Sequence, residues 1–380
     1  MRIFIPKECH PGETRAPVVP ATIARLVKLG AEVAIEPSLG ASIHYSDEDY
    51  RPAGASIAAD RAAALSGADL VLRLRPPPPA DIARLKRGAI HVSYLDPFHE
   101  HALVRSLAEA GVSAVSMEMI PRSTLAQKMD ALSSQASIGG YVAVILAADS
   151  SPHLFPMMMT PAGTIRPARV FVVGVGVAGL QAIATAKRLG AAVSAFDTRP
   201  VVEEQVKSLG AKFIKVDLGE TGQTEQGYAK ELTPEQLSKQ REAMAAECAE
   251  ADIVITTAQV FGRKAPVIVT TAMVEKMRPG SIIVDMAIET GGNVEPARLG
   301  EEVDFGGVRI LGHANLPGRV ARTSSQMYSN NLGSFVEHFW DKDAKALRID
   351  PADAILSGCL ITHGGAIVHE TIRKLIQHDT

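Results

Sequence analysis

The sequence predicts an α/β protein built from two Rossmann-like, doubly wound parallel-sheet domains with a cleft between them. Short β-branched runs alternate with helical patterns along the chain, as expected for parallel strands joined by crossover helices. The length of 380 residues suffices for two domains that each bury a core. Aromatic residues make up only 4 % of the chain, whereas Ala, Val, Ile and Gly are abundant, a mixture typical of tightly packed parallel sheets.

The composition argues against several classes of function. The formal net charge of −3 gives no basic footprint for nucleic acid or for a membrane surface. The three cysteines, Cys9, Cys248 and Cys359, form no CxxC pair, so neither structural zinc nor a disulfide framework is expected. This cysteine usage favours a cytoplasmic location. The longest apolar runs, such as residues 141–148, are shorter than the ~20 residues that span a bilayer. The chain is therefore not expected to cross a membrane by itself.

The first domain is expected to combine both ends of the chain, residues 1–132 and 323–380. Its strands are expected at 3–5, 32–35, 70–74, 90–94 and 113–117, and its helices at 21–29, 102–110 and 325–340. The prolines at 76–79 are expected to form a stiff, extended connector. The last helix would pack its apolar face on this domain, namely Met327, Leu332, Phe335, Val336 and Phe339.

The second domain, residues 133–322, is expected to be inserted into the first. Its strands are expected at 170–173, 193–196, 213–216, 253–256, 282–284 and 308–311. A helix at 178–189 ends at Gly190. The polar, glycine-rich stretch 217–232 is too long for a tight turn and is expected to be a mobile surface loop. A ligand is expected in the cleft between the domains.

The strongest motif is the glycine turn Gly174-Val175-Gly176-Val177-Ala-Gly179, which follows an apolar strand and opens a helix. In this context Gly174 makes a tight turn, Gly176 lets the backbone approach a pyrophosphate, and Gly179 lets helix and strand pack closely. The helix N-terminus offers free amides and a partial positive charge to the phosphates. The turn therefore predicts a dinucleotide site.

An acidic residue stands at the end of the next strand, in the segment Asp197-Thr198-Arg199. A carboxylate there, about 20 residues beyond the glycines, can accept hydrogen bonds from the adenosine ribose and repels a 2′-phosphate. Asp197 therefore favours NAD(H) over NADP(H). Arg199 could instead hold a 2′-phosphate, but Asp197 weighs more because it lies at the strand tip itself.

A second polar group runs from Arg122 to Gln135, with Gln127, Asp130 and Ser134 at helical spacing. A solvated helix start would show the same pattern, so spacing alone leaves both interpretations open. The segment is rich in hydrogen-bonding side chains but has no evident His or Lys base. Oxidation of an alcohol or amine requires a general base, whereas hydride transfer between two nicotinamides requires orientation, closeness and exclusion of water.

Several segments, spread over nearly the whole chain, resemble the NAD(H)-binding component of proton-translocating NAD(P) transhydrogenases. They are PRSTLAQKMDALSSQ (121–135), VGVGVAGLQAIATAKRLGA (173–191), AFDTRP (195–200), GYAKE (227–231) and SSQMYSNNL (324–332). The resemblance implies direct hydride transfer between NADH and NADP⁺ bound on a partner subunit, coupled to proton translocation by membrane subunits. It also implies a homodimer that docks on an NADP(H)-binding subunit at a membrane proton channel, peripherally on the cytoplasmic face of the inner membrane.

The resemblance also assigns roles to single residues. Contacts to the nicotinamide half of the cofactor fall on Arg122, Gln127, Asp130 and Ser133. A loop closes over the nucleotide with Gly227 and Tyr228, and Ala258 and Gln259 make further cofactor contacts. Two departures from the family pattern affect these contacts, namely Leu125 in place of an arginine and the altered segment around Gln259.

Alanine dehydrogenases are similar in fold and share the start of the chain and the glycine turn. They carry a catalytic lysine and histidine in stretches that here read VLRLRP and YLDPF, so Arg75 and Asp96 stand at those places. His91 and His99 lie near but out of register. Three hypotheses follow: a transhydrogenase subunit that needs its partner, an amino-acid dehydrogenase active alone, and a nucleotide sensor without activity. The missing base favours the first.

Overall fold

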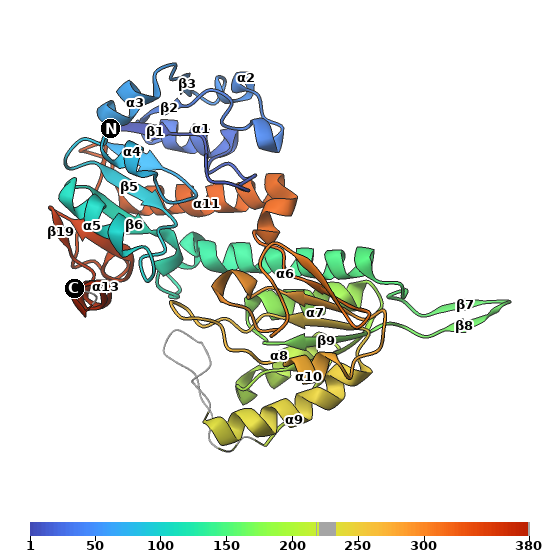
Figure 1. Cartoon of the computed structure of the whole chain (residues 1–380). Helices are drawn as coiled ribbons and strands as arrows, with labels where there is room; N and C mark the ends of the chain where they lie inside the picture. The colour runs from blue at the N-terminus through green and yellow to red at the C-terminus, as the bar shows by residue number, and fades with distance from the viewer. Residues whose placement is uncertain (218, 220–232, 379–380) are drawn as a thin grey trace. The chain divides into compact units, whose positions relative to one another are not determined.

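The computed structural model describes residues 1–217, 219 and 233–378 (Figure 1). The chain divides into two compact units: unit 1 is Met1–Gln135 with Gly318–Thr380, and unit 2 is Ala136–Pro317. The sequence placed these boundaries at 132/133 and 322/323. The first boundary carries no local signal because it falls inside a continuous helix, α6 (Ala131–Ser150).

Unit 1 is organised around a mixed sheet with the strand order β19-β18-β6-β5-β4-β1-β2-β3. The strands are β1 (Arg2–Ile5), β2 (Glu32–Ile35), β3 (Ser56–Ile57), β4 (Leu70–Leu72), β5 (Ile90–Ser93), β6 (Ser113–Ser116), β18 (Leu360–His363) and β19 (Ala366–Ile367). Strands β1 to β6 pair in parallel, whereas β18 is antiparallel to β6 and β19 is antiparallel to β18. The five predicted strands are present, and the short β3, β18 and β19 are additional.

Helices and two short strands complete unit 1. The helices are α1 (Pro20–Lys28), α2 (Asp47–Tyr50), α3 (Arg61–Gly67), α4 (Pro79–Ile82), α5 (His101–Glu109), α11 (Ala321–Phe339), α12 (Leu356–Cys359) and α13 (Glu370–His378), and β16 (Trp340–Asp341) pairs with β17 (Ala346–Leu347). Helix α11 starts four residues earlier than predicted. It buries the predicted apolar side chains of Leu332, Phe335, Val336 and Phe339 in the core, but Met327 is 42 % exposed, so that prediction was wrong.

At the carboxyl end of β1, unit 1 places an acidic side chain. One oxygen of Glu8 accepts hydrogen bonds from the backbone amides of Leu74 (2.6 Å) and Arg75 (3.3 Å), just beyond β4. Its other oxygen lies 3.3 Å from the guanidinium of Arg73, which is buried. Strands β1 and β4 are neighbours in the sheet, so Glu8 bridges their ends.

Unit 2 contains the second sheet, with the strand order β11-β10-β9-β12-β13-β15-β14. The strands are β9 (Arg169–Val173), β10 (Ala192–Phe196), β11 (Lys212–Phe213), β12 (Ile253–Thr256), β13 (Ile282–Asp285), β14 (Glu302–Phe305) and β15 (Val308–Leu311). All pairs are parallel except β14 with β15. The order reverses between β9 and β12, and in open α/β sheets ligands bind outside the carboxyl ends of the strands at such a point.

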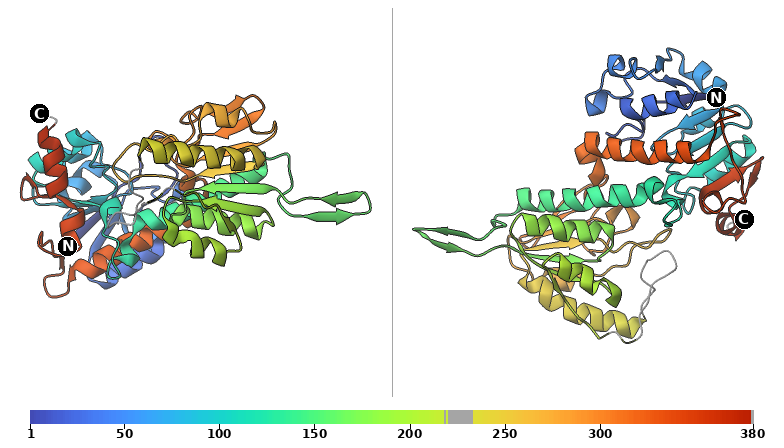
Figure 2. Two further views of the ribbon diagram at one scale, coloured as in Figure 1. Left: turned by 90° about the horizontal axis from the view of Figure 1, so that it is seen from below. Right: turned by 180° about the vertical axis from the view of Figure 1, so that it is seen from behind.

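Helices flank this sheet, and a hairpin extends from it (Figure 2). The helices are α7 (Val177–Arg188), α8 (Glu203–Ser208), α9 (Pro234–Glu250) and α10 (Thr271–Val274), with the later part of α6, and the hairpin consists of β7 (Met158–Thr160) and β8 (Gly163–Ile165). The sequence predicted α7 and the strands of the sheet apart from β14. It did not predict the hairpin.

Among the described residues, α6 is the one helix long and apolar enough to cross a membrane by length and composition, and 44 % of its apolar window is buried. The predicted apolar run 141–148 is only the second half of this helix. The small residues before it continue the helix, because Gly139 and Gly140 allow close packing instead of ending it. A Cβ atom at Gly140 would overlap the backbone carbonyl of Ala178 at the start of α7.

A buried histidine makes the stability of unit 1 depend on pH. Burial, with the nearby charge of Arg73, lowers the pKa of His91 to about 3, and its Nε2 lies 3.0 Å from Ser93 Oγ. The unfolded chain therefore binds a proton near pH 6.5 that the folded chain does not, and stability falls as the pH drops below that value. We expect a loss of about 2 kcal/mol between pH 7.5 and pH 5 from this residue. Urea unfolding at both pH values should show a smaller loss for His91→Gln than for the parent, and equal losses would contradict the assignment.

Candidate functional site

The glycine turn lies at the carboxyl end of β9, at the reversal point of the unit 2 sheet. Gly174 has a φ of +92°, and a Cβ there would lie 2.8 Å from Thr257 Oγ1. A Cβ at Gly179 would overlap the carbonyl oxygen of Gly174. At Gly176, in contrast, a Cβ would meet no atom of the described residues within 4 Å. Two glycines thus make close packing possible and the third borders open space, which is the arrangement that a bound pyrophosphate requires.

Helix α7 begins directly after Gly176, and among the described residues no side chain caps it. The amides of its first turn therefore have no partner within the helix, and they carry the positive end of its dipole. Val177, at the first helical position, is 38 % exposed, whereas Val175 is buried. The chemistry of this terminus suits an anion, so a phosphate group fits the residues present.

The carboxylate of Asp197, at the end of β10, is held by Arg199 and by the glycine turn. Oδ1 accepts from the backbone N–H (2.9 Å) and from Nε (2.9 Å) of Arg199. Oδ2 accepts from Nη2 of Arg199 (2.8 Å) and from the Val175 amide (2.7 Å). Hydrogen bonding to Asp197 raises the pKa of Arg199. Thr198 lies half-buried between them in the chain. The sequence did not predict that Arg199 would bind the acid beside it.

The segment after β12 lies against the glycine turn. Thr257 Oγ1 donates to the Gly174 carbonyl (2.9 Å), which joins the ends of β9 and β12. Ala258 is fixed on both sides by Asn293, whose Oδ1 accepts from the Ala258 amide (3.0 Å) and whose Nδ2 donates to the Ala258 carbonyl (2.8 Å). Gln259 is exposed, and its amide nitrogen donates to the Met286 carbonyl (3.1 Å).

Asp285 and Asn293 support this segment, and neither was predicted from the sequence. Asp285 is fully buried and accepts from the amides of Asn293 (2.8 Å), Val294 (3.0 Å) and Ala287 (2.9 Å) and from Thr256 Oγ1 (3.0 Å). Burial raises the pKa of Asp285 despite these donors. An acidic residue at the end of the apolar run 282–284 was the available signal.

In unit 1 the polar motif forms a short helical turn, η3 (Gln127–Met129), followed by α6. Asp130 lies between them, and its Oδ1 accepts from the Ser133 amide (2.8 Å) at the start of α6. Asp130 and Ser133 are therefore together, whereas Gln127 and Arg122 are exposed on the preceding segment. The Asp130 amide donates to the Gln127 carbonyl (3.4 Å) within the short turn, and the backbone at Asp130 (ψ +83°) separates this turn from α6.

A buried network stands behind this motif. Arg15 Nη1 donates to Gln135 Oε1 (2.8 Å), and Gln135 Nε2 donates to the Ser324 carbonyl (3.1 Å). Glu13 pairs with Arg15 and Arg75, each at 2.7 Å. Burial alone would raise the pKa of Glu13, but the two arginines lower it to about 2. The network holds Gln135 of α6, and both guanidinium groups share one carboxylate of the chain itself.

The places that carry lysine and histidine in alanine dehydrogenases have partners of their own. Arg75 pairs with Glu13, and Asp96 Oδ1 lies 2.7 Å from His99 Nδ1 on the surface. His91, with its lowered pKa, is a neutral core residue. His91 is therefore a core residue, and His99 is a surface residue paired with Asp96. Among the described residues, no group of three or more His, Cys, Asp or Glu side chains is placed to hold a metal ion.

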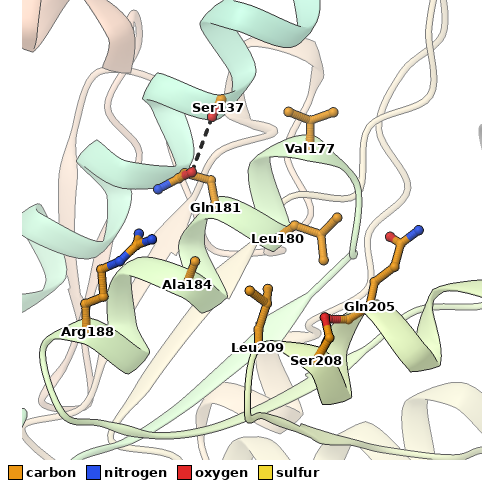
Figure 3. Close-up of a pocket in the computed structure, with 9 residues that line it drawn as sticks. All are labelled: Ser137, Val177, Leu180, Gln181, Ala184, Arg188, Gln205, Ser208 and Leu209. Atoms are coloured by element: carbon orange, nitrogen blue, oxygen red, sulfur yellow. Dashed lines mark hydrogen bonds between the residues drawn. The ribbon is translucent and has the colours of Figure 1, made fainter.

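Unit 2 also has an open hollow of about 480 Å³ on the outer side of α7, beside α8 (Figure 3). Leu180, Ala184 and Leu209 make its apolar floor, and Ser137 Oγ lies 3.5 Å from Gln181 Oε1 at its edge. Of the turn residues, only Val177 reaches it. Gly176 itself does not line the hollow. The predicted contacts Gly227 and Tyr228 lie outside the described residues.

Comparisons with known proteins agree with this geometry. Residues 4–139 match the model "Alanine dehydrogenase/PNT, N-terminal domain", and residues 143–370 match "Alanine dehydrogenase/PNT, C-terminal domain". The chain is 46 % identical to the first part of the NAD(P) transhydrogenase alpha subunit of Rhodospirillum rubrum, over 98 % of this chain and 99 % of the relative. It is 41 % identical to the protein of the same name from Rickettsia prowazekii, over 98 % of each.

Solved structures also match this chain over nearly its whole length. A transhydrogenase from Sinorhizobium meliloti superposes with a TM-score of 0.87 and 43 % identity, covering 97 % of this chain and all of that one. An L-alanine dehydrogenase superposes with a TM-score of 0.81 and 25 % identity over the full length of both. The predicted fold class of two Rossmann-like units is confirmed. The chain belongs to the alanine dehydrogenase/PNT family, and within it to the NAD(P) transhydrogenase alpha subunits.

Proposed function

We propose that the chain binds NAD(H) on unit 2 and exchanges a hydride directly with NADP(H) held on a partner subunit. The open space beside Gly176, between the α7 N-terminus and Asp197, carries the proposal. The names of the relatives, NAD(P) transhydrogenase subunit alpha, support the reaction and the need for other subunits. Bound NAD(H) would supply the hydride.

The residues of the chain then bind, orient and exclude water. The α7 terminus holds the pyrophosphate, and Asp197 accepts from the adenosine ribose. Arg122, Gln127, Asp130 and Ser133 would contact the nicotinamide half. No proton moves at the reacting carbons, so no general base is needed. The pairing of Arg15 and Arg75 with Glu13 and the neutral state of buried His91 support this interpretation over amino-acid oxidation.

The test compares the chain alone with the chain mixed with an NADP(H)-binding subunit from a related transhydrogenase. The proposal predicts NADH binding by the chain alone, and hydride exchange between NADH and an NADP⁺ analogue only in the mixture. Turnover of NAD⁺ with alanine by the chain alone would instead identify an amino-acid dehydrogenase. Binding with neither activity would identify a nucleotide sensor.

The assembly would be a homodimer, peripheral on the cytoplasmic face of the inner membrane through its partner subunits and their proton channel. An exposed apolar surface supports the homodimer: the β7–β8 hairpin and the residue before it present Met157 (61 % exposed), Met158 (42 %), Met159 (73 %) and Ile165 (44 %). Figure 1 shows the hairpin projecting from the rest of unit 2. Exposed apolar groups of this kind mark protein contacts.

Replacing Met159 with aspartate should therefore weaken the dimer about a hundredfold. Each copy loses about 1.5 kcal/mol of apolar burial, and the two copies together lose about 3 kcal/mol. Sedimentation at micromolar concentration should show a shift to monomer. The control is Leu299→Asp, which changes a 56 % exposed leucine elsewhere in unit 2. If the Met159→Asp protein sediments like the control, the hairpin is not part of the dimer interface.

A further inference from the structure

The carboxylate of Asp197 has all its acceptor positions filled by the described residues around it. Each carboxylate oxygen has two lone pairs, and each here receives two hydrogen bonds. Oδ1 binds the Arg199 amide and Nε, and Oδ2 binds Arg199 Nη2 and the Val175 amide. The side chains are 7 % (Asp197) and 14 % (Arg199) exposed, so the bidentate pair is largely shielded from water. Arg199 Nη2 also donates to the Val175 carbonyl (3.1 Å), which ties the guanidinium to the glycine turn.

Two of the four donors belong to the backbone and remain in place when the Arg199 side chain moves. The other two, Nε and Nη2, occupy one lone pair on each oxygen. Removing them would free one acceptor position on Oδ1 and one on Oδ2. A ribose carries two neighbouring hydroxyls, and each can donate one hydrogen bond. The diol therefore needs two acceptor positions, as many as the guanidinium fills on Asp197.

We infer that Arg199 is a specificity-determining residue whose guanidinium competes with the adenosine ribose diol for Asp197, so NAD(H) binds by exchanging one for the other. The inference rests on the proposed function, because it assumes that the dinucleotide binds at this turn. The exchange replaces two charge-assisted hydrogen bonds with two others, and breaking the pair lowers the net affinity. The displaced guanidinium then lies beside the ribose, where it could bind a 2′-phosphate.

The sharpest test uses fragments that differ only in the diol: adenosine 5′-phosphate and its 2′,3′-dideoxy analogue. The dideoxy compound lacks both hydroxyls, so it cannot replace the hydrogen bonds of Arg199 to Asp197. In Arg199→Met, adenosine 5′-phosphate should bind about tenfold tighter than in the parent, because one strong interaction no longer has to be broken, while the dideoxy compound binds as before. The preference for the diol therefore rises about tenfold. A purely structural effect would change both affinities alike.

Two more variants complete this test. Arg199→Lys keeps the charge but loses the planar fork, so its preference for the diol should lie between the other two. Arg166→Met is the matched control, because Arg166 and Asp252 form another bidentate pair in unit 2 (2.7 and 2.9 Å), next to the amino end of β12. This control should bind both fragments like the parent. Equal changes for both fragments in Arg199→Met, or weaker binding of adenosine 5′-phosphate, would overturn the inference.

A third ligand, adenosine 2′,5′-bisphosphate, tests the specificity. In Asp197→Ala the released Arg199 should bind its 2′-phosphate, so the affinity for this compound relative to adenosine 5′-phosphate should rise at least about tenfold. The rise should vanish in the double variant Asp197→Ala/Arg199→Met, and its persistence there would contradict the role of Arg199. If the parent chain binds neither NADH nor adenosine 5′-phosphate, the proposed function fails. If the parent binds both and the ratios stay constant, only the competition is wrong.

Discussion

Replacing Gly176 with alanine should leave the stability of the fold unchanged and weaken NADH binding at least about tenfold. The backbone at Gly176 (φ −82°, ψ −165°) is one that alanine adopts easily, and an added Cβ meets no atom of the described chain within 4 Å. The same methyl group would project into the space where the pyrophosphate approaches the helix terminus. Overlap of this size costs about 1.5–3 kcal/mol, or roughly tenfold to a hundredfold in affinity.

Thermal unfolding with and without NADH measures both quantities in one experiment. The Gly176→Ala protein should unfold at the temperature of the parent without nucleotide, and should gain less from added NADH. Adenosine, which has no phosphate, is the control ligand, because the methyl group should not affect it. Wild-type affinity for NADH in this variant would show that the pyrophosphate binds elsewhere.

Replacing Gly179 with alanine should have the opposite pattern and destabilise unit 2 by about 3 kcal/mol. Alanine in place of glycine normally stabilises a helix by about 1 kcal/mol. Here the new Cβ would overlap the carbonyl oxygen of Gly174, and it would lie 3.2 Å from Thr257 Oγ1. A backbone carbonyl cannot rotate away as a flexible side chain can, so the turn and α7 must separate, and overpacking of this kind is strongly unfavourable.

Chemical denaturation is the measurement for this variant. The control is Gly67→Ala at the end of α3, where the nearest atom to the new Cβ is Arg2 Nη1 at 3.5 Å and no strain is expected. A stable Gly179→Ala protein would mean that helix and turn do not pack as closely as described. NADH binding should also fall in this variant, but only together with the loss of stability.

The glycine turn was predictable because its chemistry is local. A tight turn, an approach to a ligand and a close helix crossing each exclude a Cβ at one position, so three letters in the sequence record three contacts. The apolar strands β9, β12 and β13 were predictable for a similar reason, since strands buried on both faces have no polar side. Strand β14 is as long as β12 and β13, but its residues alternate between exposed and half-buried, so it has no apolar run to recognise.

The remaining features depend on tertiary contacts. Nothing in the local sequence shows that Asn293 supports Ala258, which is 35 residues away, or that α6 continues past Gly139 and Gly140. The orientation of Arg199 is also not written in the segment Asp197-Thr198-Arg199. The sequence suggested opposite roles for the acid and the arginine, whereas in the structure the Arg199 guanidinium binds the Asp197 carboxylate.

The two sheets share one topology. The strands β3-β2-β1-β4-β5-β6 in unit 1 follow the same order as β11-β10-β9-β12-β13-β15 in unit 2. Yet the crossover after β1 begins Pro6-Lys7-Glu8, and its turn at Pro11-Gly12 lacks the GxGxxG spacing of the turn in unit 2. Glu8 itself accepts from the amides beyond β4, so a carboxylate of the chain already lies at this end of the unit 1 sheet. One dinucleotide per polypeptide is the stoichiometry to expect, although the architecture offers the place twice.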